Sequence, residues 1–332
     1  MDRNWIDNLP KVDLHCHLDG SIPLATLEAI AEKDSLVFDA NKAVAPDKCT
    51  DLADYLTCFD AILPLLQTAE NLELGTYALV ESLAAEQVQY AEIRFAPLLH
   101  RHQGLTIAQV ILAVCQGISR ARQEFDIQVN LIISGMRHHS EEQNLSLVQE
   151  AIQQSFPYLV AFDAAGDEAS YDNQVVANYI KAAKEAGFAI SLHSGECGCA
   201  HNVYEAMQLG ASRIGHGVAI ADNPKILNHV VQEGIVLELC PISNLQTNAI
   251  PSWSTYPLQF FLDQGVKCTI NTDNRTVSQT TLTREFLTLS KQCGLTRKQV
   301  EKLSYIAIEA SFADEVTKSH LRDRLDSYLR NE

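Results

Sequence analysis

The sequence predicts an α/β protein of the (β/α)8, TIM-type barrel class, and three observations support this. The first is a set of eight short apolar runs rich in strand-forming residues, at positions 11–19, 88–97, 127–137, 159–168, 189–196, 212–218, 235–241 and 267–274. The second is the helical pattern that follows each run, because strands that alternate with helices form parallel sheets. The third is the length of 332 residues, which suits eight such units.

An open doubly wound sheet is the alternative arrangement of alternating strands and helices. In such sheets a G-x-G-x-x-G fingerprint often follows the first strand, and the ligand lies in one crevice. Here no such fingerprint follows positions 11–19, and the potentially reactive residues lie at the ends of several strands. Both observations favour the closed barrel.

The connection after the first strand is much longer than the others and has helical patterns of its own. Within it, apolar residues recur at three- and four-residue spacing, as on one helix face: Leu52, Tyr55, Leu56, Phe59, Leu63 and Leu66. We therefore expect a helical insertion after strand one, with this face packed as core. Because no repeat, low-complexity tract or linker interrupts the chain, we expect a single domain over residues 1–332.

Composition and charge narrow the class of function. Acidic residues outnumber basic ones by 42 to 25, which gives a formal charge of −17, and the basic residues are dispersed. Because phosphate backbones are bound by clustered Lys and Arg, we expect no nucleic-acid partner. A neutral or cationic small molecule is the better match to this charge.

The sequence also indicates a cytoplasmic location. No apolar run approaches the ~20 residues of a membrane span, and the first residues lack the basic-then-apolar plan of a signal peptide.

Nine cysteines, an odd number, are scattered mainly through apolar stretches, so we expect reduced thiols rather than a disulfide framework. Cys197 and Cys199 form one C-x-C pair, which is a weak metal signal alone.

Two histidines interrupt the first predicted strand, in the stretch "VDLHCHLDGS". Because side chains alternate along a strand, His15 and His17 should project from one face, ~7 Å apart, with the carboxylate of Asp19 just beyond them. Two ligands at that spacing can hold one metal ion. A lone H-x-H pair is more often a pair of ordinary histidines, so further residues are needed.

Those residues lie at the ends of other strands, where a barrel of this class forms its active-site mouth. His193 ends the fifth predicted strand, His216 lies in the sixth, and Asp273 ends the eighth. Three histidines and one aspartate suit a divalent metal with an open position for water, and zinc accepts such ligands. His15, His17, His193 and Asp273 are therefore the candidate ligands.

Two further side chains suit proton transfer at this mouth. Glu196 follows His193 by three residues, and the Ser194-Gly195 step lets the chain leave the strand so that both side chains can face the pocket. His216 is flanked by glycines that permit close approach, and it could orient or deprotonate a water molecule. By contrast, we interpret "HRHQ" (His100, His102) and "RHHSEE" (His138, His139) as solvated loops.

The motifs "HLDGS", "DAAGDE", "HSGE", "RIGHG" and "NTDN" together resemble the adenosine deaminase family, within the metal-dependent amidohydrolase superfamily, over essentially the whole chain. The resemblance implies hydrolytic removal of the 6-amino group of adenosine or 2'-deoxyadenosine, with one Zn²⁺ per chain. The other zinc deaminase signature, H-x-E with P-C-x-x-C, does not occur here. The roles that the resemblance implies fall on these positions: His15, His17, His193 and Asp273 as zinc ligands, with His17 also at the substrate; Glu196 as proton donor to purine N1; His216 as the residue that positions or deprotonates water; Asp19 at a ribose hydroxyl; the Gly166 backbone at purine N3; and Tyr55, Leu56 and Phe59 as apolar cover.

One position departs from the family pattern. Asn274 stands where the family usually has a second aspartate, which interacts with purine N7. An asparagine amide can donate to N7 as it stands, whereas an aspartate must first be protonated. The chemistry is thus more firmly predicted than the substrate, since relatives on this scaffold act on adenine, AMP or aminodeoxyfutalosine. The adenine enzymes carry glutamate where this chain has Asp19.

A protein that binds nucleosides without catalysing a reaction is the alternative from another functional class. The sequence does not indicate the oligomeric state.

Overall fold

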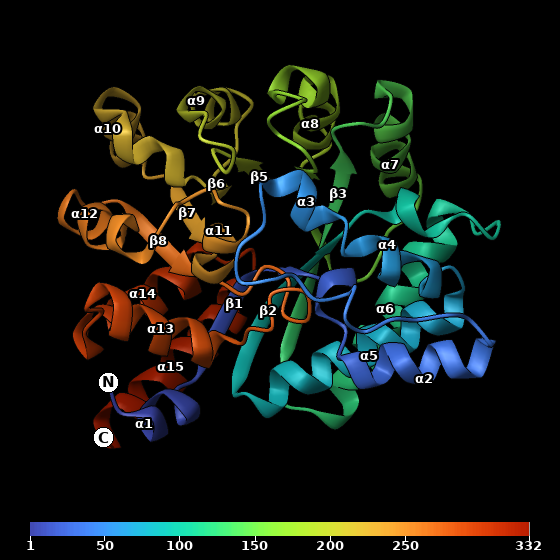
Figure 1. Cartoon of the computed structure of the whole chain (residues 1–332), viewed down its shortest axis with the longest axis horizontal. Helices are drawn as coiled ribbons and strands as arrows, with labels where there is room; N and C mark the ends of the chain where they lie inside the picture. The colour runs from blue at the N-terminus through green and yellow to red at the C-terminus, as the bar shows by residue number, and fades with distance from the viewer. Residues whose placement is uncertain (332) are drawn as a thin grey trace.

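The protein is a barrel of eight parallel strands surrounded by helices (Figure 1), in a computed structural model that describes residues 1–331. Each strand pairs in parallel with the next one along the chain. The strands are Lys11–His17 (β1), Val88–Phe95 (β2), Gln128–Met136 (β3), Leu159–Ala165 (β4), Ala189–Ser194 (β5), Arg213–His216 (β6), Val236–Leu239 (β7) and Lys267–Ile270 (β8). Every strand lies within one of the predicted runs, so the predicted fold class is confirmed.

The barrel closes between β1 and the residues that follow β8. The backbone N–H of His17 donates to the carbonyl of Asp273 at 2.7 Å, and the N–H of Asp273 donates to the carbonyl of His15 at 2.8 Å. Closure therefore brings residues from the two ends of the chain together, and these are three of the candidate metal ligands.

Helices separate the strands and cover the barrel. The α-helices are Arg3–Asn8 (α1), Leu24–Asp34 (α2), Leu52–Leu56 (α3), Phe59–Ile62 (α4), Ala69–Ala85 (α5), Ile107–Glu124 (α6), Glu141–Gln153 (α7), Ala177–Glu185 (α8), Ala200–Gln208 (α9), Pro224–Glu233 (α10), Pro241–Gln246 (α11), Leu258–Asp263 (α12), Leu282–Cys293 (α13), Arg297–Ala310 (α14) and Glu315–Asn331 (α15). Short 3-10 helices lie at Asp19–Ser21 (η1), Leu63–Leu65 (η2), Pro97–His100 (η3), Asn173–Val176 (η4), Val218–Asp222 (η5) and Trp253–Thr255 (η6). Within residues 1–331, no helix combines the length and the apolar character that crossing a membrane would require.

The predicted helical insertion after β1 is present and contains α2 to α5. Its apolar face belongs to two short helices, α3 and α4, and to η2, rather than to one continuous helix. In Figure 1, α3 and α4 cross in front of the barrel, over the ends of the strands. The insertion is thus placed to cover the mouth of the barrel.

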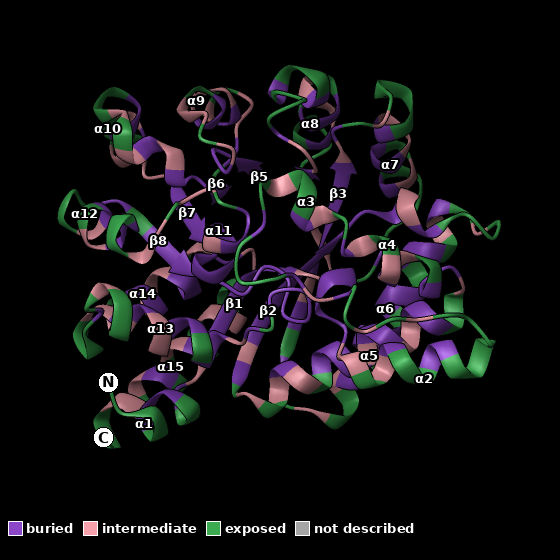
Figure 2. Ribbon diagram, viewed as in Figure 1, coloured by how far each residue is buried: buried purple, intermediate pink, exposed green. Residues whose placement is uncertain are grey.

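Strands and inward helix faces are buried, whereas the outer helix faces are exposed (Figure 2). The barrel interior differs from the apolar filling expected of strand interiors, because it holds a chain of buried ion pairs. Arg213 pairs with Glu92 and with Glu238, and Arg94 pairs with Glu238 and with Asp163. A buried charge is stable only when it is paired and hydrogen-bonded, so these residues depend on one another.

Candidate active site

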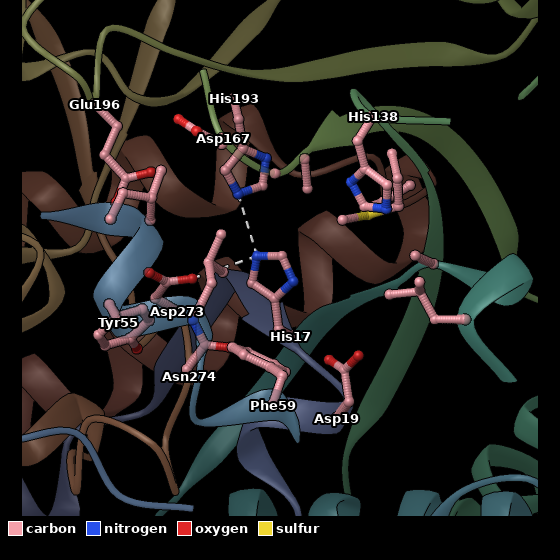
Figure 3. Close-up of a pocket in the computed structure, with 18 of the residues that line it drawn as sticks. His17, Asp19, Tyr55, Phe59, His138, Asp167, His193, Glu196, Asp273 and Asn274 are labelled. Carbon is pink, nitrogen blue, oxygen red and sulfur yellow. Dashed lines mark hydrogen bonds and ion pairs between the residues drawn. The ribbon is translucent and has the colours of Figure 1, made fainter. Parts of the chain in front are cut away.

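A cavity of about 340 Å³ opens at the carboxyl ends of the strands. Nearly all of the residues singled out in the sequence line it (Figure 3): His17, Asp19, Tyr55, Leu56, Phe59, Gly166, His193, Glu196, His216, Asp273 and Asn274. His15 is fully buried and is in ring contact with His17 and His193. The structure therefore brings every candidate site residue to one place.

Four of these side chains form a group that can hold a metal ion. The ligand atoms of His15, His17, His193 and Asp273 all lie within 4.8 Å of one another. His17 Nε2 lies 3.1 Å from His193 Nε2 and 3.3 Å from Asp273 Oδ1, and His15 Nε2 lies 3.5 Å from the same oxygen. A tetrahedral site with bonds of about 2.1 Å has edges of about 3.4 Å, so these separations match the edges of a zinc-sized tetrahedron.

The hydrogen bonding of His15 also fits a metal. Among residues 1–331, its Nε2 is buried without a hydrogen-bond partner, and a native protein rarely leaves such an atom unused. A second possible group exchanges two members for His216 and Cys240. Burial and then the Asp273 charge raise the pKa of the Cys240 thiol well above its usual range. The group of three histidines and one aspartate is the better site, because three of its members line the cavity and Cys240 does not.

Two buried carboxylates orient the histidines, and sequence reasoning missed both. Asp163 Oδ2 lies 2.8 Å from His193 Nδ1, and Glu238 Oε2 lies 2.8 Å from His15 Nδ1. With its Nδ1–H donated to a carboxylate, each imidazole presents the lone pair of Nε2 to the metal group. The available signal was an acidic residue within each of two apolar strand runs, "LVAFDAA" and "IVLEL".

Arg94 joins these two carboxylates. Its Nη1 donates to Asp163 Oδ2 at 3.2 Å and its Nη2 to Glu238 Oε2 at 2.7 Å. Burial alone would raise the pKa of both carboxyls. The His193 and Arg94 charges reverse this for Asp163, and the Arg94 and Arg213 charges reverse it for Glu238, so both pKa values lie well below the usual range. Both groups are therefore ionised acceptors.

The backbone is unusual at two of the site residues. His216 and Asp273 have φ angles of 62° and 59°, in the left-handed region that few residues other than glycine adopt. The glycines that flank His216 are needed for close packing, as the sequence predicted. A Cβ on Gly215 would lie 2.8 Å from His15 Cε1, and Gly217 itself has a φ of 69°. Strained backbone of this kind is typical of functional sites.

Glu196 is a buried carboxyl whose surroundings favour the protonated form. It lies two residues beyond the end of β5, where Gly195 turns the chain with a φ of 75°. Burial, followed by the charges of Asp273 and Glu168, raises its pKa well above the usual range. His216 Nε2 lies 3.5 Å from its Oε2. A neutral carboxyl at neutral pH can act as a general acid.

His216 stays neutral for a related reason. Burial lowers its pKa well below the usual range, and Asn244 Nδ2 lies 2.9 Å from its Nδ1. Asp273 also has a partner on the same helix as Asn244, α11, because the Ser243 hydroxyl donates to its Oδ2 at 2.6 Å. Helix α11, which follows β7, thus fixes two residues of the site, and its role was not predicted from the sequence.

Asp19 lies on the opposite side of the cavity from Glu196 (Figure 3). Its side chain belongs to a residue that is only 4% exposed, and burial raises the pKa of its carboxyl to about 6. The interpretation of His100 as a solvated loop residue is wrong. It is fully buried, because η3 turns its ring inward, where Nδ1 bonds the Leu66 carbonyl at 3.0 Å and Nε2 lies 3.8 Å from Asp19 Oδ2. His102 and His138 are exposed as expected, although His138 also lines the cavity.

The apolar face of the insertion covers the cavity rather than only packing as core. Five of its six residues line the cavity: Leu52, Tyr55, Leu56, Phe59 and Leu63. The Tyr55 hydroxyl is held by the Ser278 hydroxyl at 2.7 Å. Gly166, with a φ of 103°, lines the wall formed after β4.

Asn274 lies in the cavity wall next to the turn that follows β1. A Cβ on Gly20 would come within 2.0 Å of Asn274 Oδ1, so the glycine of "HLDGS" is needed to seat this amide. Within the described part of the chain, that oxygen is buried without a hydrogen-bond partner. A buried polar group without a partner in the protein is a candidate contact for a ligand.

The barrel, the metal-binding group at its mouth and the buried Glu196 carboxyl, whose pKa is raised, together define an amidohydrolase-type hydrolase. Comparison with known proteins then narrows the class. The family model for adenosine deaminase matches residues 10–328, so the chain belongs to the adenosine deaminase family.

Individual relatives agree with this assignment. The chain is 39% identical to an adenosine deaminase from Enterococcus faecalis, over 99% of this chain and 100% of that protein. It is 41% identical to an adenosine deaminase from Clostridium botulinum, over 95% of this chain and 96% of the relative. Among solved structures, an adenine deaminase from Arthrobacter aurescens shares the fold, with a TM-score of 0.91 at 24% identity, over 97% of this chain and 99% of that one.

Proposed function

We propose that this chain is a zinc-dependent aminohydrolase that converts adenosine and 2'-deoxyadenosine to inosine and 2'-deoxyinosine, with release of ammonia. The observation that carries the proposal is that the metal-binding group and the buried carboxyl of Glu196, whose pKa is raised, meet in one cavity. The two bacterial relatives named above, both adenosine deaminases, support the choice of substrate. We further propose that residues 1–332 act as one domain in the cytoplasm, without nucleic-acid or membrane partners.

His15, His17, His193 and Asp273 would hold one Zn²⁺ per chain. The set of nitrogen and oxygen donors and the near-tetrahedral separations support zinc. When bound, the ion would lower the pKa of water from near 16 to about 7 and so supply hydroxide at neutral pH.

The protein's own groups handle the protons. Glu196 donates a proton to purine N1, which draws electron density from C6 and prepares that carbon for attack. His216, neutral at working pH, orients or deprotonates the attacking oxygen through Nε2. As the C–N bond breaks, Asp273 and His216 pass a proton towards the departing ammonia. General acid–base groups of this kind typically contribute 10²–10⁴-fold each.

Substrate binding uses the rest of the cavity wall. Asp19 accepts a hydrogen bond from a ribose hydroxyl, the Gly166 backbone meets purine N3, and the Asn274 amide donates to N7. Tyr55, Leu56 and Phe59 exclude water above the base, and His17 contacts the substrate beside the metal. The burial of Asp19 and Asn274 supports these roles, because a buried polar group contributes most to specificity when a ligand completes its hydrogen bonds.

A substrate panel tests the proposal. Ammonia release should be fastest with adenosine and 2'-deoxyadenosine, and slower with adenine, AMP and aminodeoxyfutalosine. Glu196→Gln, which keeps the shape but removes the donated proton, should lower kcat on adenosine by about 10²–10⁴-fold. A loss below about tenfold would mean that another group protonates N1. Tight binding of adenosine without any ammonia release would instead support a nucleoside-binding protein.

A further inference from the structure

Glu168 is a buried carboxylate next to the site that has no role in the mechanism above. It follows β4, in the motif "DAAGDE", and is 4% exposed. Its Oε1 accepts the backbone N–H of Gly195 at 2.6 Å, and its Oε2 accepts those of Glu196 at 2.9 Å and Cys197 at 3.2 Å. One side chain therefore binds three consecutive N–H groups of the segment that carries Glu196.

This segment depends on such a partner. The chain leaves β5 after Ser194 and enters α9 only at Ala200, so residues 195–199 belong to neither a strand nor a helix. Buried backbone N–H groups need an acceptor, and the carboxylate supplies it. Asn202, on α9, donates to the same Oε1 at 2.8 Å and braces the carboxylate from behind. Glu168 thus fixes the backbone from which the Glu196 side chain enters the cavity.

Glu168 also adds a negative charge beside Glu196. Four charged or titratable groups from other elements act on the Glu196 carboxyl: Glu168 after β4, Asp273 after β8, Arg137 after β3, and His216 at the end of β6. A cation held by Asp273 would offset the charge of that carboxylate. Glu168 would then be the anion that continues to favour the neutral form of Glu196.

We propose that Glu168 is a positioning residue for Glu196: it holds the backbone of the proton donor and adds a second negative charge that acts on its carboxyl. This inference rests on the proposed function, because it assumes that Glu196 protonates the substrate. Glu168 itself touches neither the substrate nor the metal group in this role.

The variant Glu168→Gln tests the inference with little change in shape. Each carboxylate oxygen of Glu168 accepts from two donors. The amide nitrogen of glutamine is itself a donor, so in either orientation it would face two donors and lose two hydrogen bonds. We expect kcat on adenosine to fall by about 10- to 100-fold, as for a small misplacement of a catalytic group. We also expect the alkaline limb of the kcat–pH profile to move to lower pH, by about half a unit or more, because Glu196 loses a like charge.

Two further variants separate position from charge. Glu168→Asp keeps the charge but shortens the side chain, so kcat should fall while the alkaline limb stays in place. Glu86→Gln is the control, because Glu86 is a largely buried carboxylate that accepts a backbone N–H from Thr283 at 2.6 Å, pairs with Arg275 at 2.8 Å, and does not line the cavity. It should leave the limb unmoved. Amide hydrogen exchange at residues 195–197 should be faster in both Glu168 variants than in the Glu86 variant.

The outcomes are distinct. An alkaline limb that stays in place in Glu168→Gln, or that moves equally in Glu168→Asp, would overturn the inference. If Glu168→Gln does not fold, Glu168→Asp and the exchange measurement decide, since unchanged kcat and unchanged exchange in Glu168→Asp would also overturn it. Wild-type protein that releases no ammonia from adenosine would refute the proposed function instead.

Discussion

Discrimination between adenosine and AMP should depend on pH through Asp19. If Asp19 lies at the ribose end of the cavity, a 5'-phosphate would bring a second negative charge near its carboxylate. Two unit charges ~4 Å apart at an effective dielectric constant of 20 repel by about 4 kcal/mol, or roughly three powers of ten in kcat/KM. The discrimination against AMP is limited to a smaller value, because the buried carboxyl of Asp19 can take up a proton when AMP binds.

The size of this limit on discrimination follows from the pKa of Asp19, which burial raises to about 6. Above pH 6 the carboxyl is ionised, and protonating it costs about 1.4 kcal/mol for each pH unit above the pKa. Discrimination from this source should therefore be about tenfold at pH 7 and about 100-fold at pH 8, and it should be lost as the pH falls through 6. Burial lowers the pKa of the neighbouring His100 to about 4, so His100 is neutral over this range and does not cancel the Asp19 charge.

The assay is the ratio of kcat/KM for adenosine and AMP, measured by ammonia release between pH 6 and 9. The ratio should rise with pH in the wild type. In Asp19→Asn it should be nearly flat, because the amide does not ionise. A ratio that is independent of pH in the wild type, or that rises equally in Asp19→Asn, would show that another group rejects the phosphate.

Two further predictions concern the cavity wall and the metal group. If Asn274 donates to N7, 7-deaza-adenosine should react about 5- to 150-fold more slowly than adenosine, since an unsatisfied buried donor costs ~1–3 kcal/mol. The variant Asn274→Asp should lose activity on adenosine most at alkaline pH, and its rate should change little between adenosine and the 7-deaza analogue. Equal effects of the substitution on both substrates at every pH would place Asn274 away from N7. Asp163→Asn should weaken zinc binding by about 10- to 100-fold in a chelator competition, because the carboxylate that orients His193 loses its charge. Unchanged affinity would show that the backbone, held by Arg137 at the His193 carbonyl, suffices to place His193.

The sequence was sufficient for the fold and for the candidate site because both depend on local patterns. Each strand appears as an apolar run, and parallel strands bring the residues at their carboxyl ends together at one mouth. His15, His193 and Asp273 could therefore be grouped although they lie far apart in the chain. Gly195 and Gly217 were also informative, since each has a positive φ that turns the backbone next to a site residue.

The residues that sequence reasoning missed are those whose role depends on a partner across the barrel. Asp163, Glu238 and Arg94 are charged residues within apolar strands, and nothing local shows that they pair with one another and with two histidines. His100 was misassigned for a similar reason. A polar "HRHQ" turn looks solvated, but η3 directs this one side chain towards Leu66 and Asp19.

The central claim, that this chain deaminates adenosine with one zinc ion held by His15, His17, His193 and Asp273, is tested most directly by titrating zinc into chelator-treated protein while ammonia release is followed. We expect activity on adenosine to be absent from the metal-free protein and to rise linearly to a plateau at about one zinc per chain. His17→Ala and Asp273→Ala, which each remove one donor from the group, should prevent this recovery at stoichiometric zinc. Full activity in protein that contains no metal would contradict the account.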